Sequence, residues 1–127
     1  EGIEFGSHTR THPDLLSISA ASIEDEIAGS KASLDDALGL ETASFAYPFG
    51  RKNEMVKGIA AANYRSATST VLGKVTPHSD LYSLERVDAY YLSNPWILDR
   101  LDTAGFDRYL TVRQFLRNAK AFAARPY

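Results

Sequence analysis

Two histidines four positions apart, His8 and His12, are the residues in the first part of the chain best suited to chemistry. Imidazole nitrogen is a good ligand for Zn²⁺, and catalytic zinc sites usually combine three protein ligands with a water molecule. A pair that follows a strand can converge on one ion, because open α/β folds place their sites beyond the carboxyl ends of strands. Two surface histidines in a turn are the alternative interpretation of the same spacing.

A second candidate is the segment Phe45–Gly50, in which an apolar run meets Tyr-Pro-Phe-Gly. A turn of this kind forms a rigid rim where a backbone N–H can face a ligand and aromatic rings can stack on a sugar. A strand that ends in a tight turn, with its aromatic rings in the core, is the alternative here. Each pattern taken alone therefore leaves its function open.

The elements that must position these residues alternate along the chain. Apolar patterning predicts strands over residues 2–7, 43–47, 64–71 and 84–92. It predicts helices over residues 22–38 and 53–63, a short helix from Pro95, and a last helix over residues 111–125. The alternation predicts an α/β fold with parallel strands.

Capping residues set the expected helix ends. Ser22, Asn53 and Asn94 are expected to cap three helix N-termini, Gly39 to end the first helix, and Gly105 to break the short one. The expected core-facing side chains are Ile23, Ile27, Leu34 and Leu38, then Met55, Val56, Ile59 and Ala60, and finally Val112, Phe115, Leu116, Ala119 and Phe122.

The composition bounds the function. The 127 residues suit one domain or a piece of one, and a net charge of −2 gives no electrostatic case for nucleic acid as a partner. There is no cysteine, so disulfides and thiolate metal sites are excluded. We expect no transmembrane segment and see no signal peptide, although a chain that starts at Glu1 says nothing about export.

Taken together and in order, the two candidate segments are much more specific. Residues 6–15 resemble the His-[Ser/Thr]-x-x-His motif of the polysaccharide deacetylase family, also called NodB-homology or carbohydrate esterase family 4 domains. Residues 45–50 look like the third motif of that family. The resemblance covers residues 2–92 and implies part of an irregular (β/α) barrel whose first strand is missing, over a single incomplete domain at residues 1–127.

The resemblance also implies roles for individual residues. His8 and His12 match the metal ligands, with Zn²⁺ the expected divalent cofactor, and the backbone N–H of Tyr47 matches the oxyanion donor. Pro48, Phe49 and Gly50 match the wall of the substrate groove. The implied reaction is hydrolysis of N-acetyl groups on an N-acetylhexosamine polysaccharide, in an exported or cell-envelope protein.

The chain departs from the family pattern in several places. The Asp-Asp motif that supplies a third ligand and the general base belongs before Glu1, and Asp35 and Asp36 are expected on a solvated helix surface. Ala46 stands where many members have arginine, and Arg86 is a candidate substitute charge, although a surface position is the alternative. The general acid is not found, since His78 has the wrong flanking residues.

Three further expectations remain open. Trp96 can stack on a sugar or pack in the core. The chain can be a non-catalytic carbohydrate-binding or inactive fragment, because the aspartate motif is absent from it, or an amidase of another type, although it has no His-Glu-x-x-His helix. A missing first strand would leave an open sheet edge through which the chain can associate.

Overall fold

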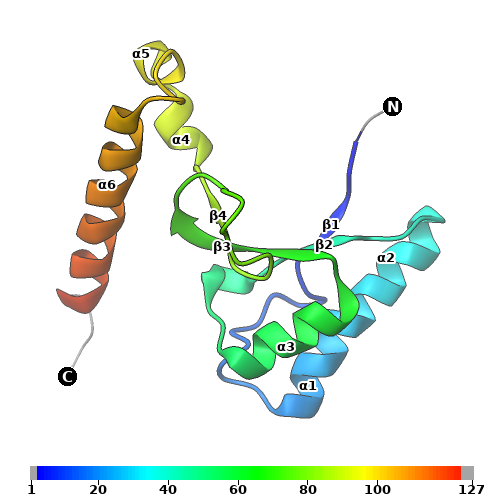
Figure 1. Ribbon diagram of the computed structural model, residues 1–127. Coiled ribbons are helices and arrows are strands. Elements are labelled where there is room, and N and C mark those ends of the chain that lie inside the picture. The colour runs from blue at the N-terminus through cyan, green and yellow to red at the C-terminus, as the bar shows by residue number, and fades with distance from the viewer. Residues whose placement is uncertain (1–2, 124–127) are drawn as a thin grey trace. The chain divides into compact units, whose positions relative to one another are not determined.

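Parallel strands form the sheet of this computed structural model, which describes residues 3–123. The strands are β1 (Gly6–Ser7), β2 (Ser44–Ala46), β3 (Ser66–Leu72) and β4 (Leu84–Arg86), and they lie in that order (Figure 1). β2 pairs in parallel with both β1 and β3. The predicted α/β fold with parallel strands is therefore confirmed.

The chain divides into two units. The first comprises residues up to 70 together with 78–84, and the second comprises residues 71–77 and those from 85 onward. The prediction that residues 1–127 belong to one incomplete domain stays a prediction. In residues 3–123, no helix is long and apolar enough to cross a membrane.

The first predicted helix forms as three consecutive pieces, α1 (Ala20–Glu24), a π-helical turn η1 (Asp25–Gly29) and α2 (Ser30–Leu38). Its cap is Ser19 instead of the predicted Ser22, because the Ser19 hydroxyl accepts from the Ser22 N–H at 3.2 Å. It ends as predicted at Gly39, which adopts a left-handed conformation with φ 66°.

The core of the first unit lies between these helices, α3 (Glu54–Asn63) and the sheet. Asn53 caps α3 as predicted, since its side chain accepts from the Val56 N–H at 2.9 Å. The buried apolar cluster consists of Leu15, Ile23, Ile27, Phe45, Tyr47, Val56, Ala60, Tyr64 and Ala67. Of the predicted core residues, Leu38 and Met55 are instead exposed.

The second unit corrects two predictions and confirms a third. Residues 84–92 do not form one strand: β4 ends at Arg86, and Asp88 caps the helix α4 (Ala89–Leu92) by accepting from the Tyr90 N–H. Asn94 caps α5 (Pro95–Leu98) as predicted. Gly105 does not break that helix but lies near the start of α6 (Ala104–Ala123). The predicted end of α6 at Arg125 lies outside the described residues, as does Gly2 of the predicted first strand.

The inward face predicted for the last helix is also wrong. Among the residues of α6 whose burial is described, the buried ones are Phe106 and Leu110, near its start. The residues predicted to face inward are all exposed, namely Val112, Phe115, Leu116, Ala119 and Phe122. The helix begins at Ala104, seven residues before the predicted start at Thr111. The residues that pack inside this unit therefore lie in the first turns, before the predicted helix begins.

We predict that Gly50→Ala destabilises the first unit more than Gly39→Ala does. Both glycines have a positive φ, 67° and 66°, so an added Cβ costs about 1 kcal/mol at either position. A Cβ at Gly50 would also clash with the side chain of Thr70, whereas one at Gly39 meets nothing within 4 Å. Overpacking should add about 1–3 kcal/mol at Gly50 alone. Urea unfolding of the two variants measures the difference, and equal losses would contradict the predicted clash.

Candidate metal and substrate site

The structure brings His8 and His12 together at the end of β1. Their ring centroids lie 4.7 Å apart with the planes at 73°, and both side chains belong to exposed residues. The ring of Phe49 lies 4.8 Å from that of His12, also edge to face. The two segments singled out in the sequence, residues 8–12 and 45–50, therefore meet at one place.

A hydrogen bond fixes the orientation of the His8 ring. Its Nδ1 lies 2.7 Å from the carbonyl oxygen of Ala46, the last residue of β2. A carbonyl can only accept, so Nδ1 must carry a proton, and in the neutral ring Nε2 keeps its lone pair. Bonds of this type fix the tautomer and orientation of histidines that bind metals. His8 is thus prepared to offer Nε2 as a ligand.

The backbone between the two histidines adopts rare conformations. Thr9 and His12 have φ values of 67° and 59°, which are uncommon for residues with a Cβ. Each such residue costs on the order of 1–3 kcal/mol and persists only where its surroundings impose it. One local constraint is the Thr9 hydroxyl, which accepts from the His12 N–H at 3.1 Å.

Glu26, in the π turn η1, binds the same loop from the helix side. Its carboxylate accepts from the backbone N–H groups of Arg10 (2.8 Å) and Thr11 (2.9 Å) and from the Thr11 hydroxyl (2.6 Å). Burial acts to raise the pKa of Glu26, but these bonds outweigh it and hold the pKa below the ordinary value. Sequence analysis missed this contact because it joins residues 15 and 16 positions apart.

Buried hydroxyl groups join the same π turn to β1. The carbonyl of Ile27 accepts from the hydroxyls of Ser30 and Tyr64, each at 2.9 Å. Ser30 also contacts the hydroxyl of Ser7 at 2.7 Å, directly before His8. The Ile27 carbonyl also accepts from the backbone N–H of Ser30, so the cluster gives each of its buried hydroxyls a hydrogen-bond partner.

The rim segment sends its aromatic rings to different places. Tyr47 is buried, which agrees with the alternative interpretation that the aromatic rings of this segment lie in the core. Its hydroxyl donates to the Tyr82 carbonyl at 2.9 Å, and burial raises the pKa of this hydroxyl. Pro48 is buried in the 3₁₀ turn η2 (Pro48–Gly50), while Phe49 is 59% exposed. The backbone N–H of Tyr47 donates to Thr68 at 3.3 Å.

The donor set meets part of the requirement for a divalent metal. Two imidazoles with one fixed tautomer supply two of the three protein ligands that catalytic zinc sites use. Among residues 3–123, no three His, Cys, Asp or Glu side chains gather closely enough to hold an ion. Asp36 is exposed and Asp35 is partly exposed, as predicted for the helix surface, and the Asp35 carboxylate also accepts from the Thr42 N–H and from Lys31.

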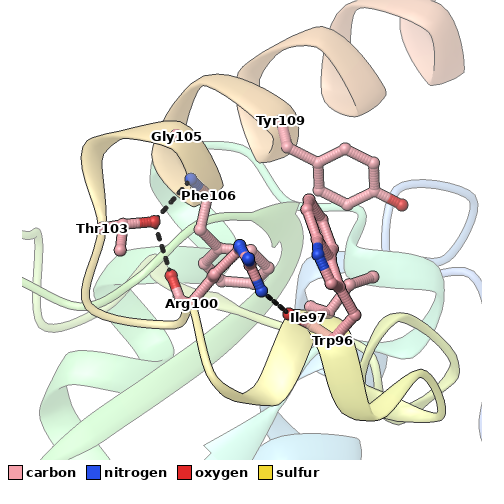
Figure 2. A pocket seen from close by; sticks show the side chains of 7 residues that line it. All are labelled: Trp96, Ile97, Arg100, Thr103, Gly105, Phe106 and Tyr109. Atoms are coloured by element: carbon pink, nitrogen blue, oxygen red, sulfur yellow. Dashed lines mark hydrogen bonds between the residues drawn. The ribbon is translucent and has the colours of Figure 1, made fainter.

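Arg86 and Trp96, the remaining predicted site residues, belong to the second unit. Arg86 is exposed at the end of β4. Trp96 is 61% exposed, so it is not a core residue of this unit, and the Arg100 guanidinium lies 3.9 Å from its ring centroid. Trp96 and Arg100 line a pocket of about 400 Å³. Figure 2 shows these two side chains together with Phe106 and Tyr109. The predicted roles of Arg86 and Trp96 stay predictions.

Comparison with known proteins gives the family. The model of the polysaccharide deacetylase family matches residues 1–67, which include both histidines and the rim segment. The YxkH protein of Bacillus subtilis (strain 168), named as a polysaccharide deacetylase, is 31% identical over 87 residues. That match covers 68% of this chain and 31% of YxkH. A gellan lyase of Bacillus sp is 43% identical over 72 residues, or 56% of this chain and 3% of the lyase.

Solved structures agree with this. The deacetylase PplD of Streptococcus pyogenes, in complex with acetate, is 38% identical with a TM-score of 0.63. The similarity covers 65% of this chain and 37% of PplD. It confirms the predicted fold class, a partial fold of the NodB type. The chain belongs to the polysaccharide deacetylase family.

Proposed function

We propose that the protein containing this chain hydrolyses N-acetyl groups from an N-acetylhexosamine polysaccharide, with a divalent metal held in part by His8 and His12. Zn²⁺ is the metal that imidazole ligands favour here, although such a site accepts other transition metals. The chain spans 31% of YxkH, so the activity of the whole protein is part of this proposal. An exported or cell-envelope location is proposed from family membership alone.

One observation carries the proposal. His8 and His12 lie 4.7 Å apart at the carboxyl end of a parallel strand, beside the exposed Phe49 ring, and a carbonyl holds Nδ1 of His8. Ligand sites of open α/β folds occur at such strand ends. The tautomer matters because Nδ1 makes the hydrogen bond to the protein and the lone pair of Nε2 is left to bind a metal.

The mechanism assigns separate tasks to the residues at this edge. A divalent metal, when bound, supplies Lewis-acid polarisation of the acetyl carbonyl and an activated water. His8 and His12 would bind the metal, and the Pro48–Gly50 turn would form the groove wall, with Phe49 offering a ring face to the sugar. The N–H of Tyr47 would stabilise the oxyanion, a contribution of about 2.7–4 kcal/mol, if its long bond to Thr68 is shared.

A specific observation favours a second candidate, a carbohydrate-binding module without turnover. Within residues 3–123 the imidazole pair has no third ligand beside it. A base is also required to take the proton from the attacking water, and two metal-bound imidazoles do not provide one. Metal binding and acetate release therefore have to be measured separately.

We predict that Zn²⁺ binding depends on both imidazoles. His8→Ala and His12→Ala should each weaken the affinity at least about tenfold, because each removes one ligand. His78→Ala is the matched control, since this exposed histidine lies in a turn outside both motifs of the sequence. Isothermal titration calorimetry measures the three affinities. A wild-type chain that binds no Zn²⁺, or three variants that bind alike, would contradict the proposed metal pair.

We predict that acetate release requires metal and an N-acetylated polymer. The substrates are chitin oligomers, poly-N-acetylglucosamine and peptidoglycan, each offered to a form of the protein extended to the length of its relatives, with Zn²⁺ and after chelation. Release that stops on chelation and returns with Zn²⁺ supports the deacetylase. Polymer binding without any release favours the module without turnover.

We predict that the neutral His8 ring is the Nδ1–H tautomer, because Nδ1 donates to the Ala46 carbonyl at 2.7 Å. Long-range ¹H–¹⁵N correlation spectra of the imidazoles distinguish the two ring nitrogens. His78 provides the comparison ring in the same sample. An Nε2–H tautomer at His8 would contradict the proposal that Nε2 binds the metal.

A further inference from the structure

We infer that Glu26 is a positioning residue that keeps the His12 imidazole beside that of His8. Its relevance to metal binding rests on the proposed function, whereas its hold on the loop does not. The carboxylate receives three hydrogen bonds from two consecutive residues, Arg10 and Thr11, which lie between the two histidines. No contact of Glu26 to either imidazole is involved, so it acts through the backbone.

The loop needs such a restraint because its conformation is strained. Thr9 and His12 both have positive φ, and a chain released at Arg10 and Thr11 would relax toward ordinary values. His8 is held independently, by β1 behind it and by the Ala46 carbonyl in front. Loss of the Glu26 contacts should therefore move His12 and leave His8 in place.

The neighbouring acidic residue makes a different kind of contact. Asp25 pairs with the Arg10 guanidinium at 2.9 Å, with side chains 66% and 47% exposed. Exposed ion pairs contribute little, because water and salt screen them. Glu26 is half-buried and its carboxylate accepts from two main-chain N–H groups, so its contacts act directly on the backbone of the loop. Asp25 is thus a matched control one residue away in the same π turn.

The proposed geometry dictates the choice of variants. Glu26→Met keeps the length and packing of the side chain but removes both acceptors. Glu26→Gln keeps one oxygen for the two N–H groups, and its amide can donate to the Thr11 hydroxyl, so all three contacts survive without the charge. Rescue by glutamine separates positioning by hydrogen bonds from an effect of negative charge near the imidazoles.

The test measures the loop itself by nuclear magnetic resonance on the full chain. Wild type should show a cross-relaxation peak between the His8 and His12 rings. In Glu26→Met that peak should be lost, and the His12 amide should exchange at least about tenfold faster, while the buried Val56 amide is unchanged. Glu26→Gln and Asp25→Asn should match wild type. An intact ring contact in Glu26→Met, or equal effects from Asp25→Asn, would overturn the inference.

Two further measurements keep the outcome decisive. Faster exchange of the Val56 amide in Glu26→Met would mean that this variant also loosens the core. In that case Thr11→Val, which removes only the hydroxyl donor, serves as the test. It must accelerate exchange of the His12 amide while the Val56 amide stays protected, or the inference fails. Zn²⁺ affinity should fall about tenfold in Glu26→Met and not in Glu26→Gln. Unchanged affinity with an open loop would refute the link to the metal. A wild-type chain that binds no Zn²⁺ would refute the proposed function, while the ring contact would still decide the role of Glu26.

Discussion

The hydrogen bond between Nδ1 of His8 and the carbonyl of Ala46 is the contact on which the arrangement of the site depends. It joins the residue after β1 to the last residue of β2, across 38 positions of sequence. Parallel pairing of Ser7 with Phe45 brings these two strand ends level, so the bond needs no distortion of the sheet. One contact thus sets the tautomer of a proposed ligand and aligns both motifs at one edge.

The π turn η1 connects the helix to both sides of this contact. Outward, it presents Glu26 to the loop that carries His12. Inward, its Ile27 carbonyl accepts from the hydroxyls of Ser30 and Tyr64 as well as from the Ser30 N–H, and Ser30 in turn contacts Ser7. π turns are uncommon and occur frequently at functional sites. Here the turn makes both sets of contacts next to the histidines.

Sequence patterns predicted the local features of the fold and missed the contacts between distant residues. Gly39, Asn53 and Asn94 mark helix ends correctly, because each acts on its own neighbours. The strand predicted at residues 84–92 failed because the cap at Asp88 was overlooked, and a cap outweighs the β propensity of two tyrosines. Periodicity also placed the apolar stripe of the last helix inward, although burial depends on what packs against a helix and not on its own sequence.

The candidate site shows the same division. The motifs identified His8, His12 and the segment 45–50, but only the fold shows why the aromatic residues of that segment differ in burial. Phe45 and Tyr47 alternate with period two and both enter the core. At Phe49 the backbone turns to φ 57°, and the ring leaves the core for the side of His12. Gly50 must follow because Thr70 occupies the space of a side chain there. The strained turn is therefore what converts a core strand into a rim beside the imidazoles.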